Sequence, residues 1–220
     1  ILITAYFIIL NVFKKNISVR KSKASKTLKY STLSSSDRAK CNDMVQNALR
    51  YTIYLDPLIS SRKKGRIRVE LLCLLRLALT DILVRNVRQE TVLKKYSDLA
   101  LLFERTKHST DILRYYINLG FSEWKKNSFQ PVFLFEKKLL KVLSDQYSLD
   151  SVKRVEKIFS KPTNIDTYIR NSVRKENYFE KLKGSSVNTS HFRFSKNVSL
   201  IETKGYRSGE WWVQSLAASL

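Results

Sequence analysis

The chain has 220 residues, 43% of them hydrophobic, which is enough to bury a core and excludes a collagen-like or wholly disordered protein. Lys and Arg number 41 against 19 Asp and Glu, and the formal net charge of +22 favours RNA, DNA or an anionic membrane as partner, although compositional drift of a proteome would account for part of it. Two cysteines and two histidines, widely separated, exclude a disulfide framework, disfavour zinc or Ser/His/Asp chemistry, and indicate a cytoplasmic protein.

The N-terminal segment is apolar and then basic. Its first ten residues, ILITAYFIIL, are about half of the roughly 20 apolar residues that a bilayer span needs, so we expect no stable membrane insertion. They carry no signal-peptide flanks and are interpreted as a docked or frayed helix or strand. Residues 14–36 hold seven basic residues and no acid, which predicts a flexible basic arm or a solvated linker. Residues 1–36 are therefore set apart from the first domain.

Helical periodicity begins at Asp37, a plausible N-cap, and continues until Pro57 ends or bends the helix. The most hydrophobic helix, 69–84, has leucines on almost every face and should be central, with Cys73 as a small buried side chain. Two further helices are expected at 89–103 and from Ser109 or Thr110 to about Gly120. Residues 37–126 thus predict an all-helical bundle.

The second half of the chain changes period. Residues 127–160 predict a helical connector, with one helix from Pro131 to about Gln146 and another at 151–159. Alternation over 165–173 predicts a strand, followed by a helix that stops at Gly184 and by strands at 191–194 and 198–203. Residues 161–220 therefore predict a small mixed α/β subdomain of ferredoxin-like type, and the fold class is α+β.

Basic residues are the candidate RNA-binding groups. The densest cluster surrounds Gly65 at an expected helix start, where backbone N–H groups would add donors for a phosphate; it comprises Arg62, Lys63, Lys64, Arg66 and Arg68. Weaker candidates are Lys94, Lys95, Lys125, Lys126, Arg170 and Arg174. For every one of them a solvated helix or strand face remains the alternative. No residue pattern in the chain indicates a metal site.

Three stretches resemble one family. Arg68 to Ala100, a leucine-rich helix, a short break and a helix opening near Glu90, resembles the core of the NusB-like RNA-binding domain fused to Sun/RsmB-type RNA cytosine methyltransferases. Further on, KPTNIDTYIRNSV, residues 161–173, is similar to the strand that begins the small subdomain of that family. GEWWVQSLAASL, residues 209–220, is similar to the segment that leads into its cofactor domain, with Ser215 where the family has Asp. The resemblance covers roughly residues 38–220.

The resemblance implies methyl transfer from S-adenosylmethionine to C5 of a cytosine in rRNA. That chemistry needs a cysteine thiolate beside a base pocket and a glycine-rich turn for the cofactor. Neither pattern occurs in this sequence, so we expect the Rossmann-type methyltransferase domain to be absent from it. No catalytic or cofactor-binding residue is assigned, and no S-adenosylmethionine is expected to bind the chain itself.

We therefore expect this chain to be the RNA-binding N-terminal part of such an enzyme, and we expect it to be a monomer. The alternative is a stand-alone NusB-like factor in transcription antitermination or ribosome assembly, without catalysis. A weaker third possibility is a peripheral membrane protein that binds through residues 1–30. Several aromatic residues could stack on unpaired bases, namely Tyr115, Tyr116, Trp124, Trp211 and Trp212. For Tyr116 a core position explains the pattern better, and the two tryptophans fit packing of the small subdomain against the catalytic domain.

Overall fold

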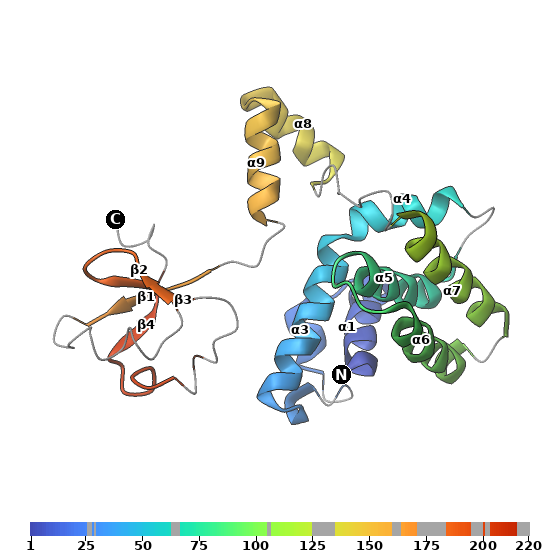
Figure 1. Ribbon diagram of the computed structural model, residues 1–220, viewed down its shortest axis with the longest axis horizontal. Helices are drawn as coiled ribbons and strands as arrows, with labels where there is room; N and C mark the ends of the chain where they lie inside the picture. Colours follow the sequence, from blue (N-terminus) through green and yellow to red (C-terminus); the bar gives the residue numbers. More distant parts are fainter. Residues whose placement is uncertain are drawn as a thin grey trace. The chain divides into compact units, whose positions relative to one another are not determined.

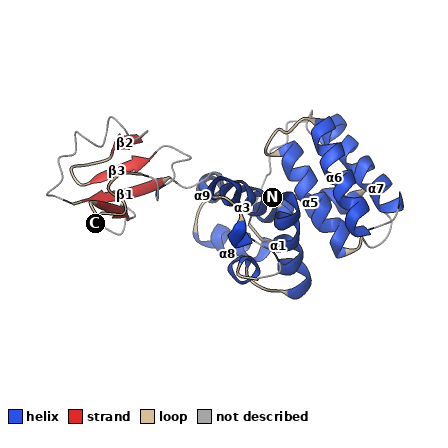
Figure 2. Cartoon of the chain, turned by 90° about the horizontal axis from the view of Figure 1, so that it is seen from below, coloured by secondary structure: helices blue, strands red, loops and turns tan. Residues whose placement is uncertain are grey.

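The computed structural model describes residues 1–25, 28, 30–62, 67–104, 107–124, 135–159, 164–170, 184–194, 200 and 203–214. It divides into two units, Ile1–Glu156 and Lys157–Leu220. The first unit is helical and the second contains a small antiparallel sheet (Figure 1; Figure 2). The predicted α+β class, a helical bundle followed by a small sheet, is thereby confirmed.

The helical unit contains the following elements in chain order: α1 (Leu2–Lys15), α2 (Val19–Lys23), η2 (Tyr30–Thr32), α3 (Ser35–Arg50), α4 (Thr52–Ser61), α5 (Val69–Leu83), α6 (Gln89–Glu104), α7 (Lys107–Leu119), the π turn η3 (Gly120–Trp124), α8 (Lys137–Gln146) and α9 (Leu149–Phe159). Helix α5 contacts α1, α3, α4, α6 and α7. Its leucines are buried on all sides, so the prediction that this helix is central is confirmed.

Two buried polar side chains of α5, Arg76 and Asp81, are each paired with polar groups outside this helix. Arg76 donates from Nε and Nη2 to the two carboxylate oxygens of Asp56 in α4, at 2.8 and 2.6 Å. Asp81 accepts from the Tyr96 hydroxyl of α6 at 2.9 Å and pairs with Arg85. Burial, and then the Asp81 carboxylate beside it, raise the pKa of Tyr96 well above its ordinary value, so the hydroxyl stays protonated and donates. These pairs connect the central helix to its neighbours.

Helix α1 belongs to the bundle, which places the domain start earlier than the expected residue 37. It contacts α3 and α5, and Ala5, Ile8 and Ile9 are fully buried. Next to it, Ser22 of α2 is buried and accepts from the Asn11 amide at 3.3 Å. The expectation of a flexible arm from residue 14 was therefore wrong for α2, because its packing against α1 orders the chain. No helix among the described residues has the length and apolar content to cross a bilayer.

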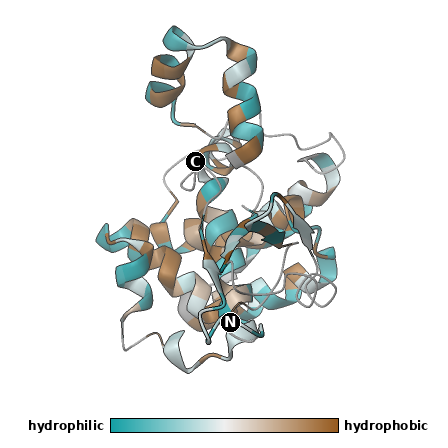
Figure 3. Cartoon of the chain, turned by 90° about the vertical axis from the view of Figure 1, so that its left-hand side faces the viewer, coloured by the Kyte–Doolittle hydropathy of each residue, from teal (hydrophilic) through white to brown (hydrophobic). Residues whose placement is uncertain are grey.

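Several helix ends differ from the expected ones. Helix α3 is capped by Ser34, whose hydroxyl accepts from the Asp37 amide at 3.1 Å, so Asp37 lies in the first turn. The helix is interrupted at Tyr51, which lies between α3 and α4, and α4 continues through Pro57. Helix α8 ends at Gln146 as expected, whereas α9 starts at Leu149, two residues before the expected 151, since the Ser148 hydroxyl accepts from the backbone N–H of Ser151 at 3.3 Å. Figure 3 shows that polar and apolar residues alternate around these last two helices. The expected helix start at Pro131 lies outside the described residues.

The sheet unit has four described strands in the order β2-β3-β1-β4, with every neighbouring pair antiparallel. They are β1 (Ile165–Ile169), β2 (Gly184–Ser186), β3 (His191–Phe194) and β4 (Trp211–Val213). Its core is formed by Ile169, Phe192, Phe194 and Trp211. The strand expected at 191–194 is confirmed, and the one expected at 165–173 is found at 165–169, with residues 171–173 outside the described part of the chain. Gly184 begins a strand where a helix stop was expected, and β4 was not expected as a strand.

Candidate nucleic-acid interface

The strongest predicted cluster is described only at its two ends. Arg62 follows α4, and its Nη2 lies 2.8 Å from Glu123 Oε2, with both side chains about half exposed. Arg68 precedes α5 and is 69% exposed, with Nε 3.8 Å from Glu70 Oε2. Exposed ion pairs of this kind contribute little stability and exchange readily for other anions. The intervening candidates Lys63, Lys64 and Arg66 lie outside the described residues.

The structure adds Lys14 to this cluster. Its Nζ lies 2.6 Å from Glu70 Oε1, so the C-terminal end of α1 meets the N-terminal end of α5. That hydrogen bond from Lys14 is the main cause that lowers the pKa of Glu70, which therefore stays ionised. The sequence pattern predicted that Lys14 belongs to a flexible arm. The signal that could have found it is the position of Lys14 and Lys15 at the end of a long apolar segment.

This junction already holds one anion. The Glu70 carboxylate lies in the first turn of α5, where the helix dipole favours negative charge, and two cationic side chains converge on it from α1 and from the residue before α5. We call Lys14, Arg68 and Glu70 the α1–α5 junction. Both cations are more than half exposed, so they can reach an RNA phosphate without breaking core contacts.

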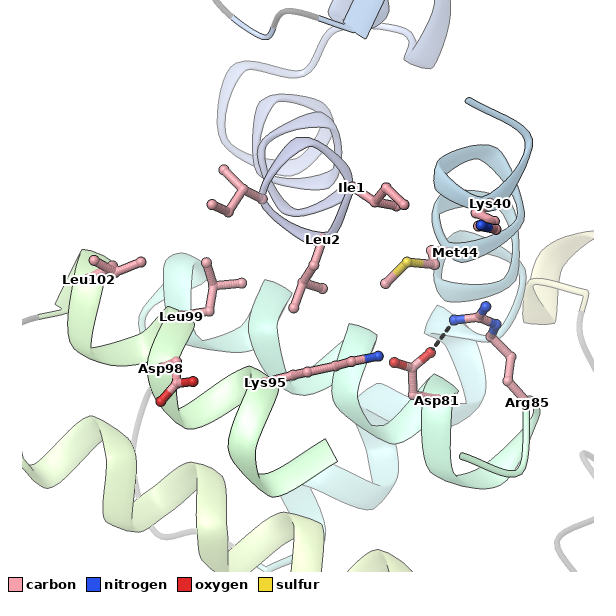
Figure 4. A pocket seen from close by; sticks show the side chains of 11 residues that line it. Ile1, Leu2, Lys40, Met44, Asp81, Arg85, Lys95, Asp98, Leu99 and Leu102 are labelled. Carbon is pink, nitrogen blue, oxygen red and sulfur yellow. Dashed lines mark hydrogen bonds and ion pairs between the residues drawn. The ribbon is translucent and has the colours of Figure 1, made fainter. Parts of the chain in front are cut away.

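Lys94 and Lys95 lie on the exposed side of α6. Lys95 lines a mainly apolar hollow of about 480 Å³, which includes Met44 of α3, Asp81 of α5 and Leu99 of α6 (Figure 4). Asp81 is thirteen residues along α5 from Arg68, which is about 20 Å at the helical rise. The two lysines and the α1–α5 junction are thus separate basic sites at opposite ends of the central helix.

The remaining basic candidates do not add to these sites. Arg170 is exposed directly after β1, in the sheet unit, and its backbone N–H donates to the carbonyl of Glu210 at 2.9 Å. Lys125, Lys126 and Arg174 lie outside the described residues.

The aromatic candidates divide into core and surface. Tyr116 is buried, and its hydroxyl donates to the carbonyl of Ile59 at 2.6 Å, so the core interpretation is confirmed. Tyr115 beside it is 51% exposed. Trp211 is buried within the sheet unit itself, with Nε1 2.9 Å from the carbonyl of Lys204, whereas Trp212 is 39% exposed. The two adjacent tryptophans therefore have different roles. The Trp124 side chain lies outside the described part of the structure.

Neither cysteine is suited to nucleophilic chemistry. Cys41 and Cys73 are both completely buried in the helical unit. Burial raises the pKa of the Cys73 thiol to about 12, despite the nearby Arg76 guanidinium. Burial also raises the pKa of Cys41. Both thiols therefore stay protonated at neutral pH, as the expected packing role of Cys73 requires.

Comparison with known proteins gives a likeness of fold. No protein-family model matches the chain, and no curated protein sequence matches it. Among solved structures, the crystal structure of PH0851 is similar, with a TM-score of 0.57 and 12% sequence identity over 97% of this chain. The match covers 53% of PH0851, so the chain spans about half the length of that protein. At this identity the likeness concerns the fold alone: the chain folds like one half of PH0851.

Proposed function

We propose that this chain is the RNA-binding N-terminal part of an S-adenosylmethionine-dependent rRNA (cytosine-C5) methyltransferase. One observation carries the proposal: the two stretches of the small subdomain that resemble this family are hydrogen-bonded neighbours. Ile169 of β1 is the register partner of Trp211 in β4, and the backbone of Arg170 bonds to that of Glu210. Two segments about forty residues apart in the sequence thus lie side by side as paired strands of one sheet.

The second stretch has the backbone that its sequence requires. Gly209 has a φ of 69°, in the left-handed region that favours glycine, and it lies two residues before the start of β4. At the other end of β4, the backbone N–H of Gln214 donates to the backbone carbonyl of Asp166 at 3.0 Å. The segment that leads into the catalytic domain of the resembled family therefore corresponds here to the last described strand of the sheet.

The likeness to PH0851 supports the same arrangement. That structure matches nearly all of this chain and contains about as much chain again. A protein built this way has room for a further domain of similar size. In the proposed enzyme that domain would bind S-adenosylmethionine and provide the cysteine for the reaction.

The described part of this chain does not fit the cofactor. A cofactor cradle needs a glycine-rich turn between a strand and a helix. Gly184 begins β2 against the Phe192 ring, Gly209 precedes β4, and Gly120 opens the π turn after α7. Gly65 lies outside the described residues. No step of methyl transfer is therefore assigned to this chain, whose proposed role is to bind and orient the RNA.

A charge-matched set of variants tests the RNA-binding role. Replacing Arg62, Lys63, Lys64 and Arg66 together by Gln should weaken binding to rRNA fragments and reduce the dependence of the binding constant on salt. The control replaces four exposed lysines of α8 and α9, namely Lys137, Lys138, Lys141 and Lys153, by Gln, which removes the same net charge. Equal binding curves for the two variants at two salt concentrations would contradict the assignment.

A stand-alone NusB-like factor is the second candidate, because the helical unit has a core of its own, separate from that of the sheet unit. The nucleotide sequence after codon 220 separates the two. The methyltransferase proposal expects the reading frame to continue into a Leu-Asp-X-X-Ala-Ala-Pro-Gly-Gly-like segment, and a stop codon would favour the factor. We also expect residues 1–220 alone to transfer no labelled methyl group to RNA; measurable incorporation would contradict this.

A further inference from the structure

The two faces of the small sheet differ in character. Paired residues in the register point to the same face, so Ile169, Phe192 and Trp211 share the side that is packed into the core. On the opposite side, the register places Tyr168 of β1 between His191 of β3 and Trp212 of β4. This second side carries aromatic rings next to charged side chains, whereas the first side carries the apolar core.

The rings on this side form a row across three strands. Tyr168 and Trp212 have ring centroids 4.9 Å apart with an interplanar angle of 30°, which is close to stacking. The His191 ring meets Tyr168 edge-on at 5.1 Å. Trp212 is held in place because its Nε1 donates to Gln214 Oε1 at 2.7 Å, yet its side chain remains accessible, with the residue 39% exposed. A preoriented and accessible indole therefore ends the row.

A polar row lies beside the aromatic one. Arg193 of β3 donates from Nε and Nη2 to the two carboxylate oxygens of Asp166 in β1, at 2.6 and 2.9 Å. Ser185 of β2 is the register partner of Arg193 on the same side. The Arg193 side chain is 39% exposed, so its guanidinium can still contact an anion.

We propose that this side of the sheet, defined by Tyr168, Trp212, Asp166 and Arg193 and called the aromatic sheet face, binds unpaired RNA nucleotides. A base stacks on Trp212 as a continuation of the Tyr168–Trp212 stack, and Arg193 contacts a phosphate or a base edge. Aromatic residues on four-stranded antiparallel sheets are a recurrent way to bind single-stranded RNA. The inference deepens the proposed function, since it takes RNA as the partner of the chain and names unpaired nucleotides as what this unit recognises.

Charge selects RNA over a protein partner. Residues 157–220 contain eleven Lys and Arg against five Asp and Glu, so the unit attracts a polyanion. Single strands are favoured over duplexes because stacking on an indole requires a base face that is not already covered by its neighbours. The α1–α5 junction, in contrast, offers only charge and would contact the phosphates of either.

The test measures binding of the full chain to a fluorescein-labelled mixed-sequence 12-nucleotide RNA, single-stranded or annealed to its complement. W212A should weaken binding to the single strand about tenfold and leave duplex binding within about twofold, while W212F, which keeps a stacking ring, should stay within about threefold of the original chain. Tyr147→Ala removes an aromatic residue that is 59% exposed in the helical unit and serves as the control, with no expected change.

The outcomes separate the two proposals. Binding of the single strand by W212A as tight as by the original chain would overturn the aromatic sheet face and leave the proposed function standing. An equal loss in W212A for single strand and duplex would also overturn it, because stacking on an open base would not explain the loss. No binding of either RNA by the original chain would contradict the proposed function and this inference together. Circular dichroism identifies a loss that is due to unfolding; if W212A unfolds, Trp212→Leu, which keeps apolar bulk without a stacking ring, takes its place with the same expected and contradicting outcomes.

Discussion

Two Arg–Asp pairs with the same geometry occur in the two units. In the helical unit, Arg76 holds Asp56 with two hydrogen bonds, and its side chain is 5% exposed. In the sheet unit, Arg193 holds Asp166 in the same way, but its side chain is 39% exposed. In the first pair the Arg76 guanidinium is the buried member, with its carbon 3.8 Å from the centroid of the Phe13 ring, whereas the Asp56 side chain is 37% exposed. The same interaction therefore supports the fold in one unit and remains available to a ligand in the other.

Breaking each pair from its acid side should give the largest contrast. Asp56→Ala leaves a buried guanidinium without its counter-ion and should lower the free energy of unfolding by about 3 to 5 kcal/mol. Asp166→Ala leaves Arg193 in contact with water and should lower the free energy of unfolding far less, because an exposed ion pair contributes little. Urea unfolding of both variants measures this, and similar losses would contradict the assignment of different roles.

The second contrast tests whether α1 is part of the helical unit. Ile8 is fully buried and Ile3 is 48% exposed on the same helix. Ile8→Ala should cost about 2 to 4 kcal/mol, because it removes buried methyl groups and leaves a cavity. Ile3→Ala should cost well under half as much. If both substitutions were nearly neutral, α1 would be a frayed helix, which is one of the two interpretations that the sequence left open.

Glycine substitutions compare close packing in the two units. A Cβ on Gly184 would lie 2.6 Å from Phe192 Cε1 and would also overlap the carbonyl oxygen of Arg193, which is backbone and cannot yield easily. A Cβ on Gly120 would meet side-chain atoms, with the flexible end of Leu79 at 3.1 Å and Ile82 Cδ1 at 3.4 Å. We expect Gly184→Ala to destabilise the protein by about 1 to 3 kcal/mol and Gly120→Ala by less. Thermal unfolding gives the order, and the reverse order would be inconsistent with the described sheet.

The smallest expected effect concerns pH and the α1–α5 junction. The pKa of Glu70 is lowered from its ordinary value of 4.5, mainly by the hydrogen bond from Lys14. The resulting stability is complete above pH 4.5 and is lost as the pH falls through the lower folded-state pKa. Lys14→Gln should therefore lower the free energy of unfolding by less than about 1 kcal/mol at pH 7, and by nothing once the pH is below the folded-state pKa of Glu70. Urea unfolding of the Lys14→Gln variant and of the original chain measures this, and a difference between them that persists or grows in acid would contradict it.

Local patterns predicted the parts of the fold that are determined locally. Helix α5 was predictable because its leucines leave almost no face for solvent, and β1 because Ile165, Thr167 and Ile169 alternate with more polar residues. Helix α1 was underestimated, since an apolar segment reads equally well as a docked or a frayed element. Strand β4 was missed because three residues, two of them tryptophan, give no period.

The candidate sites depend on contacts between distant residues. Lys14 and Glu70 are 56 positions apart and meet only because α1 packs along α5. Tyr168 and Trp212 stack only because β1 and β4 are paired in one particular register. The sequence identified Arg68 and Trp212 as residue types suited to RNA, but not their partners, because no local period encodes tertiary pairing.

The central claim is that charge at the α1–α5 junction and stacking on the aromatic sheet face contribute separately to RNA binding. The most direct test is the salt dependence of single-stranded RNA affinity for Lys14→Gln combined with Arg68→Gln, for W212A, and for the original chain. The account predicts a shallower slope of log K against log salt, by about one, for the charge variant. It predicts an unchanged slope with uniformly weaker binding for W212A. Identical slopes in all three proteins, or a shallower slope only in W212A, would contradict it.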